Sequence, residues 1–258
     1  MENMYVYLKN WDMKKYHLNN RKKMEQVELR KELLKTMNAI SSKMRDNILL
    51  NYFDKLGDDK KYVLSMMIEA YQTVDVFCYA MQNTSLTQAG LLLRQLLEQV
   101  AISYILVDHP ETLLKFIEHY KLRKEWINLK KGEQIEKISE KYGVPDKPIA
   151  LAYLDYGWIG FDDIKKCNED EMLTYAGFKD ILSWRKMYLD KLAHTSFTST
   201  DLLGEQNNFP ITRNFLEIAC KLFDYLCVAF HNLTKYSFIF DNKDLFASFR
   251  MLYSDFNI

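Results

Sequence analysis

The sequence predicts an all-α protein, folded as a single helical bundle. The 258-residue chain has only 8 glycines and 4 prolines. Apolar residues recur at spacings of three and four, and no segment shows the strict alternation that is typical of a half-buried strand. Apolar residues make up 48% of the chain, which is enough for a substantial core. We expect one domain over residues 1–258, with its core at 84–236 and residues 1–56 as a candidate N-terminal helical arm.

The expected helices follow one another along the whole chain. The first pattern, over 11–53, predicts one long helix or two helices that break near Ser41 and Ser42. Gly57, with two aspartates after it, signals a turn and the start of the next helix. The further helical patterns cover residues 62–81, 86–107, 111–131, 133–142, 169–194, 210–236 and 244–252.

Turn and capping residues separate these helices. The central helix, over 86–107, is expected to be capped by Thr84 or Ser85. It stops before Pro110, because proline suits the first position of a following helix. Gly143 is expected to end the helix over 133–142.

Composition limits the classes of protein to consider. The chain has 35 basic and 35 acidic residues, so no overall charge attracts it to nucleic acid or to a membrane surface. The N-terminal residues lack the features of a signal peptide, and the apolar helices carry charges, so we expect a cytoplasmic protein without a membrane partner. The cysteines lack disulfide or zinc-site spacing and are expected to be buried thiols. We find no motif for a cofactor or a metal.

Arg94 and Glu98 are the first candidate site residues. They are four residues apart on a helix that is apolar on nearly every side, so they project from one face and can contact each other. One interpretation is a buried ion pair that fixes helix packing. The other is a guanidinium held by Glu98 and offered to a phosphate or carboxylate.

His194 is the remote partner that we expect for this pair. It closes a predicted helix, where the helix dipole favours the imidazolium, and it either packs there or acts as a general acid or base. Asp190 lies one turn earlier and can orient the ring. Tyr188, Lys191 and Ser196 are the supporting residues of this candidate pocket.

Short motifs span the middle half of the chain. They are Arg-x-x-x-Glu in an apolar helix, a Trp-Ile-Gly segment, and Tyr-x-x-x-Leu-x-His-x-Ser at a helix end, formed by Arg94, Glu98, Trp158, Tyr188, His194 and Ser196. Together they resemble an uncharacterised bacterial helical family, a numbered domain of unknown function. The resemblance implies an all-α fold and no particular reaction.

A second likeness is to HEPN domains, helical bundles that are often ribonucleases in bacterial toxin and phage-defence systems. Their signature is an arginine shortly followed by a histidine, in a cleft formed on dimerisation. Here Arg185 precedes His194 by nine residues, so Arg94 would have to take the arginine's place. The likeness implies a metal-independent ribonuclease in which His194 accepts the 2′-hydroxyl proton and Arg94 stabilises the phosphorane charge.

Two basic stretches suggest partners. Residues 9–35, which also carry aromatic side chains, and residues 115–131 have a local excess of positive charge. These stretches suit RNA, but a solvated helix face is an alternative, and the first could pair with a second copy of the chain. We therefore expect a homodimer with an RNA or protein partner.

Three functions stay open at this point. The first is a binding or regulatory module in which the cluster of Arg94, Glu98 and His194 is structural. The second is the ribonuclease. The third is a small-ligand sensor closed by Trp158 and Phe161, which rests on aromatic content alone.

Overall fold

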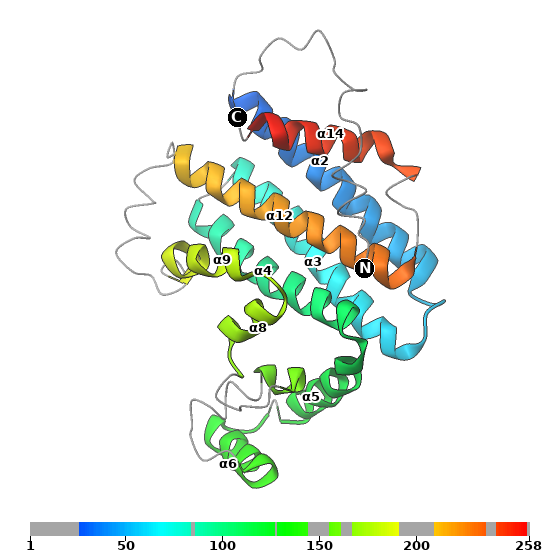
Figure 1. Ribbon diagram of the computed structural model, residues 1–258, viewed down its shortest axis with the longest axis vertical. Coiled ribbons are helices and arrows are strands. Elements are labelled where there is room, and N and C mark those ends of the chain that lie inside the picture. Colours follow the sequence, from blue (N-terminus) through cyan, green and yellow to red (C-terminus); the bar gives the residue numbers. More distant parts are fainter. Residues whose placement is uncertain are drawn as a thin grey trace.

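The computed structural model confirms the all-α prediction (Figure 1). It describes residues 26–83, 86–126, 128–143, 155–160, 167–190, 209–235 and 241–256, which form helices and no strands. The α-helices are α2 (Gln26–Asn47), α3 (Asp58–Asn83), α4 (Leu86–Asp108), α5 (Leu113–Trp126), α6 (Lys131–Tyr142), α8 (Glu169–Tyr175), α9 (Lys179–Trp184), α12 (Phe209–Thr234) and α14 (Lys243–Phe256). The short 3₁₀-helices are η3 (Pro110–Thr112) and η4 (Gly157–Ile159), and the short π-helices are η2 (Ile48–Tyr52) and η6 (Arg185–Leu189).

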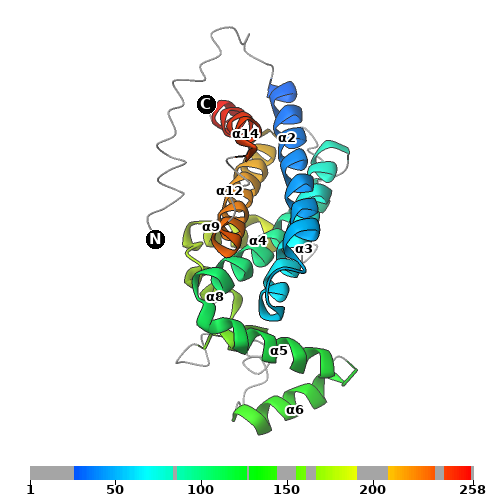
Figure 2. The same ribbon diagram turned by 90° about the vertical axis from the view of Figure 1, so that its right-hand side faces the viewer.

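Helices α2, α3, α4, α12 and α14 form the bundle (Figures 1 and 2). α3 packs against both α2 and α4, α12 lies along α4, and α14 covers α2. Their facing sides bury large apolar residues, among them Val74, Leu97, Phe223 and Phe249. Because these residues recur at helical spacing, each helix presents a continuous apolar face to the core, and burial of that face stabilises the bundle.

Helix α2 is a core helix, so the prediction of an N-terminal arm is wrong for residues 26–56. Its residues Leu33, Met37, Ile40 and Met44 are fully buried. The many lysines and glutamates of this segment lie around a single apolar stripe, which packs on α3 and α14. The helix continues through Ser41, whose hydroxyl donates a hydrogen bond to the Tyr71 carbonyl oxygen at 2.7 Å. Residues 1–25 lie outside the described residues.

Helix α4 is the central helix of the bundle. Among the described helices it alone is long and apolar enough to cross a membrane, a test that the buried helix of a bundle also passes. It packs between α3 and α12 and buries Leu93, Leu97 and Val100 completely. This packing accounts for an apolar surface on nearly every side. Its predicted caps, Thr84 and Ser85, lie outside the described residues.

Helices α5 and α6 form a separate layer below the bundle (Figure 2). α4 ends at Asp108 and η3 begins at Pro110, as predicted. Gly143 ends α6 as predicted, in the left-handed conformation with φ 66°, and its N–H donates to the Ser139 carbonyl. The segment 155–160, which contains η4, packs on α5 and reaches α4 through the hydrogen bond between Tyr156 and Glu98.

The predicted helix over 169–194 is divided into α8, α9 and η6. Gly177 has φ 82°, a conformation that ends α8 and turns the chain into α9. Asn168 caps α8 by accepting a hydrogen bond from the Glu171 N–H at 3.0 Å. These short helices bring two carboxylates of α8 next to α4.

The cysteines have the structural role that the sequence predicts. All four are buried thiols outside disulfide bonds: Cys78, Cys167, Cys220 and Cys227.

Candidate functional site

The predicted cluster of Arg94, Glu98 and His194 is only partly within the described residues. His194, Lys191 and Ser196 lie outside them, and of Tyr188 only the backbone is described. What can be placed is the environment of Arg94, Glu98 and Asp190.

Arg94 faces α8 and η6. Its Nη2 lies 3.5 Å from Glu169 Oε2, and its Nε lies 3.6 Å from Asp190 Oδ1. The side chain is 34% exposed, so Arg94 is half-buried and not enclosed. The predicted ion pair with Glu98 is not formed, because the two side chains, although one turn apart, bind different partners.

Arg185 lies at the centre of this cluster, and the sequence analysis did not select it. Its side chain is 6% exposed and contacts Glu169 and Asp170 directly, with Asp190 at 3.5 Å. Burial lowers the pKa of this guanidinium, but the hydrogen bond to Glu169 and the charges of all three carboxylates outweigh it and raise the pKa.

This ion-pair cluster is balanced in charge. It contains three cations and three carboxylates: Arg94, Arg185, Lys186, Glu169, Asp170 and Asp190. Every member has a partner of opposite sign within the cluster. Its evident effect is to hold α4, α8 and η6 together.

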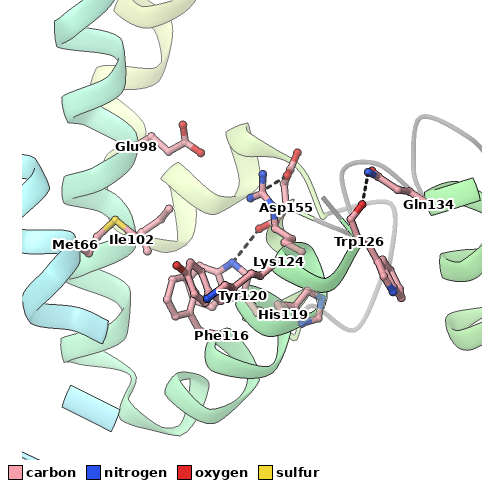
Figure 3. A pocket seen from close by; sticks show the side chains of 12 residues that line it. Met66, Glu98, Ile102, Phe116, His119, Tyr120, Lys124, Trp126, Gln134 and Asp155 are labelled. Carbon is pink, nitrogen blue, oxygen red and sulfur yellow. Dashed lines mark hydrogen bonds and ion pairs between the residues drawn. The ribbon is translucent and has the colours of Figure 1, made fainter. Parts of the chain in front are cut away.

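A different polar group lines a pocket of about 630 Å³, formed by α3, α4, α5, α6 and the segment 155–160 (Figure 3). Its apolar and aromatic walls are made by Met66, Ile102, Phe116, Tyr120, Trp126 and Trp158. Its polar lining consists of Glu98, His119, Arg123, Lys124, Gln134 and Asp155. Figure 3 shows Glu98, Met66 and Ile102 on the side of α3 and α4, across from the side chains of α5.

Helical spacing on α5 supplies the aromatic side of the pocket. Phe116, Tyr120 and Arg123 lie at positions i, i+4 and i+7 and share one face. Phe116 packs edge-to-face on Trp158, with ring centroids 5.0 Å apart. Trp158 is held in turn by its Nε1–H, which donates to the Asp155 carbonyl oxygen at 3.0 Å. The aromatic wall is therefore fixed before any ligand arrives.

Glu98 is the carboxylate on the α4 side of the pocket. The Tyr156 hydroxyl donates a hydrogen bond to its Oε1 at 3.0 Å. Burial raises the pKa of Glu98, and the nearby charges of Glu169 and Asp155 add to this rise; the Tyr156 hydrogen bond and the charge of Arg123 oppose it. Within the described part of the chain, no lysine or arginine lies at ion-pairing distance from Glu98.

Asp155, unlike Glu98, forms an ion pair within the described residues. Arg123 Nη1 lies 3.2 Å from Asp155 Oδ1. Burial raises the pKa of Asp155, and the charge of Arg123 lowers it. Gln134, from α6, donates hydrogen bonds to the carbonyl oxygens of Trp126 at 2.9 Å and Leu129 at 3.1 Å, which fixes α6 against the end of α5.

The pocket unites two residues that the sequence singled out, Glu98 and Trp158, with others that it did not. Phe161, the other residue of the predicted sensor site, lies outside the described residues. The amphipathic face of α5 was the signal that could have indicated a second lining helix. Among the residues that the structure describes, no group of three His, Cys, Asp or Glu side chains could hold a metal ion.

No protein-family model, no curated protein and no solved structure matches this chain. The resemblances to an uncharacterised bacterial family and to HEPN domains stay predictions. The argument for function therefore depends on the chemistry of the pocket itself.

Proposed function

We propose that this protein is a binding module that recognises a small organic molecule in the pocket beside Glu98 and Trp158. The observation that carries the proposal is a pocket of about 630 Å³ with an aromatic wall and a half-buried carboxylate. Small-molecule sites have volumes of roughly 300–1,000 Å³, are mostly apolar, and hold a few polar groups that orient the ligand. The pocket has each of these properties.

In this proposal the ion-pair cluster around Arg94 and Arg185 is structural. Its balanced charges support that role, because a guanidinium that already binds Glu169 and Asp190 has less to offer a phosphate. The ribonuclease, with His194 as base and Arg94 as phosphate ligand, is the less favoured alternative for this reason. A cytoplasmic homodimer with an RNA or protein partner stays a prediction from sequence.

Methyl NMR tests the proposal directly. A protein labelled with ¹³C at Met and Ile methyl groups is screened against aromatic and aliphatic amines, carboxylic acids and neutral alcohols. Ligands in the pocket shift the methyl signals of Met66 and Ile102, which line it. The signals of Met37 and Ile40, which are buried in the bundle away from the pocket, stay in place. Absence of any shift at Met66 and Ile102 contradicts the proposal.

A pair of matched variants separates pocket binding from weak surface binding. Ile102→Phe places a larger side chain in the pocket and should weaken binding about tenfold or more. Leu114→Phe makes the same kind of change on α5 at a side chain that is 64% exposed and does not line the pocket, so binding should not change. Equal binding by both variants contradicts the proposal.

A further inference from the structure

The charges around the pocket are not equivalent. Asp155 and Arg123 neutralise each other at 3.2 Å. Lys124 is exposed, so water screens its charge. Glu98 is more buried than Lys124 and lies at ion-pairing distance from no lysine or arginine of the described residues; the charge of Arg123 acts on it only from farther away. The charge that a ligand meets inside the pocket is therefore the carboxylate of Glu98.

The hydrogen bonding of Glu98 leaves room for a donor. Tyr156 donates to Oε1 at 3.0 Å, and burial keeps the tyrosine hydroxyl protonated by raising its pKa. In the described part of the chain, Oε2 accepts no hydrogen bond. Partial burial of a carboxylate costs free energy when no charge compensates it, so a bound cation that donates to Oε2 of the half-buried Glu98 would relieve this cost.

The walls next to Glu98 suit the rest of such a ligand. Phe116, Tyr120 and Trp158 line the same pocket, and Tyr120, which is 48% exposed, presents most of the accessible aromatic surface. Aromatic faces attract organic cations, and they also bury an apolar body. An anionic ligand would meet Glu98 as a like charge, and it could engage Arg123 only in competition with Asp155.

We infer that the pocket binds an organic cation, an ammonium group on an aromatic or aliphatic body, with the ammonium at Glu98 and the body against Tyr120 and Phe116 of α5. This inference rests on the proposed function, since it names the ligand class of the same pocket. It places the specificity of the site in the carboxylate of α4.

Probes of equal shape and different charge test the inference. Tryptamine is a cation at neutral pH, indole-3-ethanol is neutral, and indole-3-propionate is an anion; phenethylamine, 2-phenylethanol and 3-phenylpropionate form a smaller series. Dissociation constants come from titration of the Met66 and Ile102 methyl signals. The amine of at least one series should bind about tenfold or more tightly than its neutral and anionic partners.

Two variants assign the preference to Glu98. Glu98→Gln removes the charge and keeps an oxygen that can accept from Tyr156, so it should weaken amine binding about tenfold and leave the neutral probe unchanged. Glu118→Gln makes the same change at an exposed residue of α5 outside the pocket and should change neither. Circular dichroism and thermal melting verify that both variants are folded.

The outcomes separate this inference from the proposed function. Tighter binding of a neutral or anionic probe, or amine binding that is equal in wild type and folded Glu98→Gln, overturns the organic cation and leaves the pocket as a ligand site. If no probe and no compound of the wider screen shifts Met66 or Ile102, the proposed function fails, and the inference fails with it.

Discussion

Arg94 and Glu98 lie one turn apart on α4, but the regions that they face compensate charge in opposite ways. Arg94 faces a charge-balanced cluster in which three cations meet three carboxylates, with Arg185 almost fully buried at its centre. Glu98 faces a pocket in which a tyrosine hydroxyl is its hydrogen-bond partner.

The difference indicates what each region is for. A buried charge that the chain pairs within itself contributes to the arrangement of helices, since each member holds another in place. A half-buried carboxylate without an ion pair in the chain costs stability, and such groups occur preferentially at functional sites. We therefore assign structure to the Arg185 side of α4 and ligand binding to the Glu98 side.

The largest expected effect is on the Arg185 side. Arg185→Met removes the buried partner of Glu169 and Asp170, which keep among the described residues only the more exposed Arg94 and Lys186, and we expect the free energy of unfolding to fall by about 2–3 kcal/mol. Arg94→Met is the matched control: its side chain is 34% exposed, so the loss should be about 1 kcal/mol or less. Urea denaturation of both variants measures these values. An equal loss in the two would contradict the central position of Arg185.

On the Glu98 side, removal of the charge should stabilise the protein. The pKa of Glu98 is raised above its ordinary value of 4.5 in the folded state, so folding favours the protonated form. Wild-type stability is thus reduced as pH rises through the folded pKa, and Glu98→Gln should be more stable at neutral pH by about 1 kcal/mol. This advantage should vanish as pH falls below 4.5, where both states are protonated.

The measurement is the difference in unfolding free energy between wild type and Glu98→Gln across this pH range. The pH-dependent contributions of carboxylates that are present in both proteins, such as Glu169 and Asp155, largely cancel in this difference. A variant that is less stable than wild type at neutral pH would show that the chain already compensates the Glu98 charge. The contrast between the two sides of α4 would then fail.

A smaller effect is expected from Tyr156→Phe. The hydroxyl of Tyr156 donates to Glu98 and holds the pKa of this carboxyl down, against the effect of burial. Its removal should raise the pKa of Glu98 and lower the free energy of unfolding by about 0.5–1 kcal/mol at neutral pH. Carboxyl ¹³C NMR titration of Glu98 measures the pKa in both proteins. An unchanged pKa of Glu98 would show that Tyr156 does not tune this carboxylate.

Local features of the fold could be predicted from the sequence. The apolar surface of α4, the stop before Pro110 and the end of α6 at Gly143 depend on residues that are neighbours in the chain. The role of α2 could not be predicted, because a helix rich in lysine and glutamate with one apolar stripe suits both an arm and a core position. Only its packing on α3 and α14 decides between them.

The candidate site was harder to predict because tertiary contacts assemble it. The spacing of Arg94 and Glu98 placed both on one helix face, but their partners come from segments about 60 to 95 residues later. Trp158 and Glu98 were singled out separately, and no spacing along the chain indicates that they line one pocket. The approach of α5 and the segment 155–160 creates the pocket, and that approach is not a local property.

The last prediction concerns RNA, which we expect the protein not to cleave. In the ribonuclease hypothesis Arg94 stabilises a phosphate, but here it binds Glu169 and Asp190, which a phosphate would have to displace. The wild-type protein should therefore leave a mixed pool of labelled RNAs intact. Cleavage by wild type, lost in folded His194→Ala and in folded Arg94→Gln, would instead mean that the ion-pair cluster opens to a substrate. Both sides of α4 would then be functional, and charge balance would no longer distinguish them.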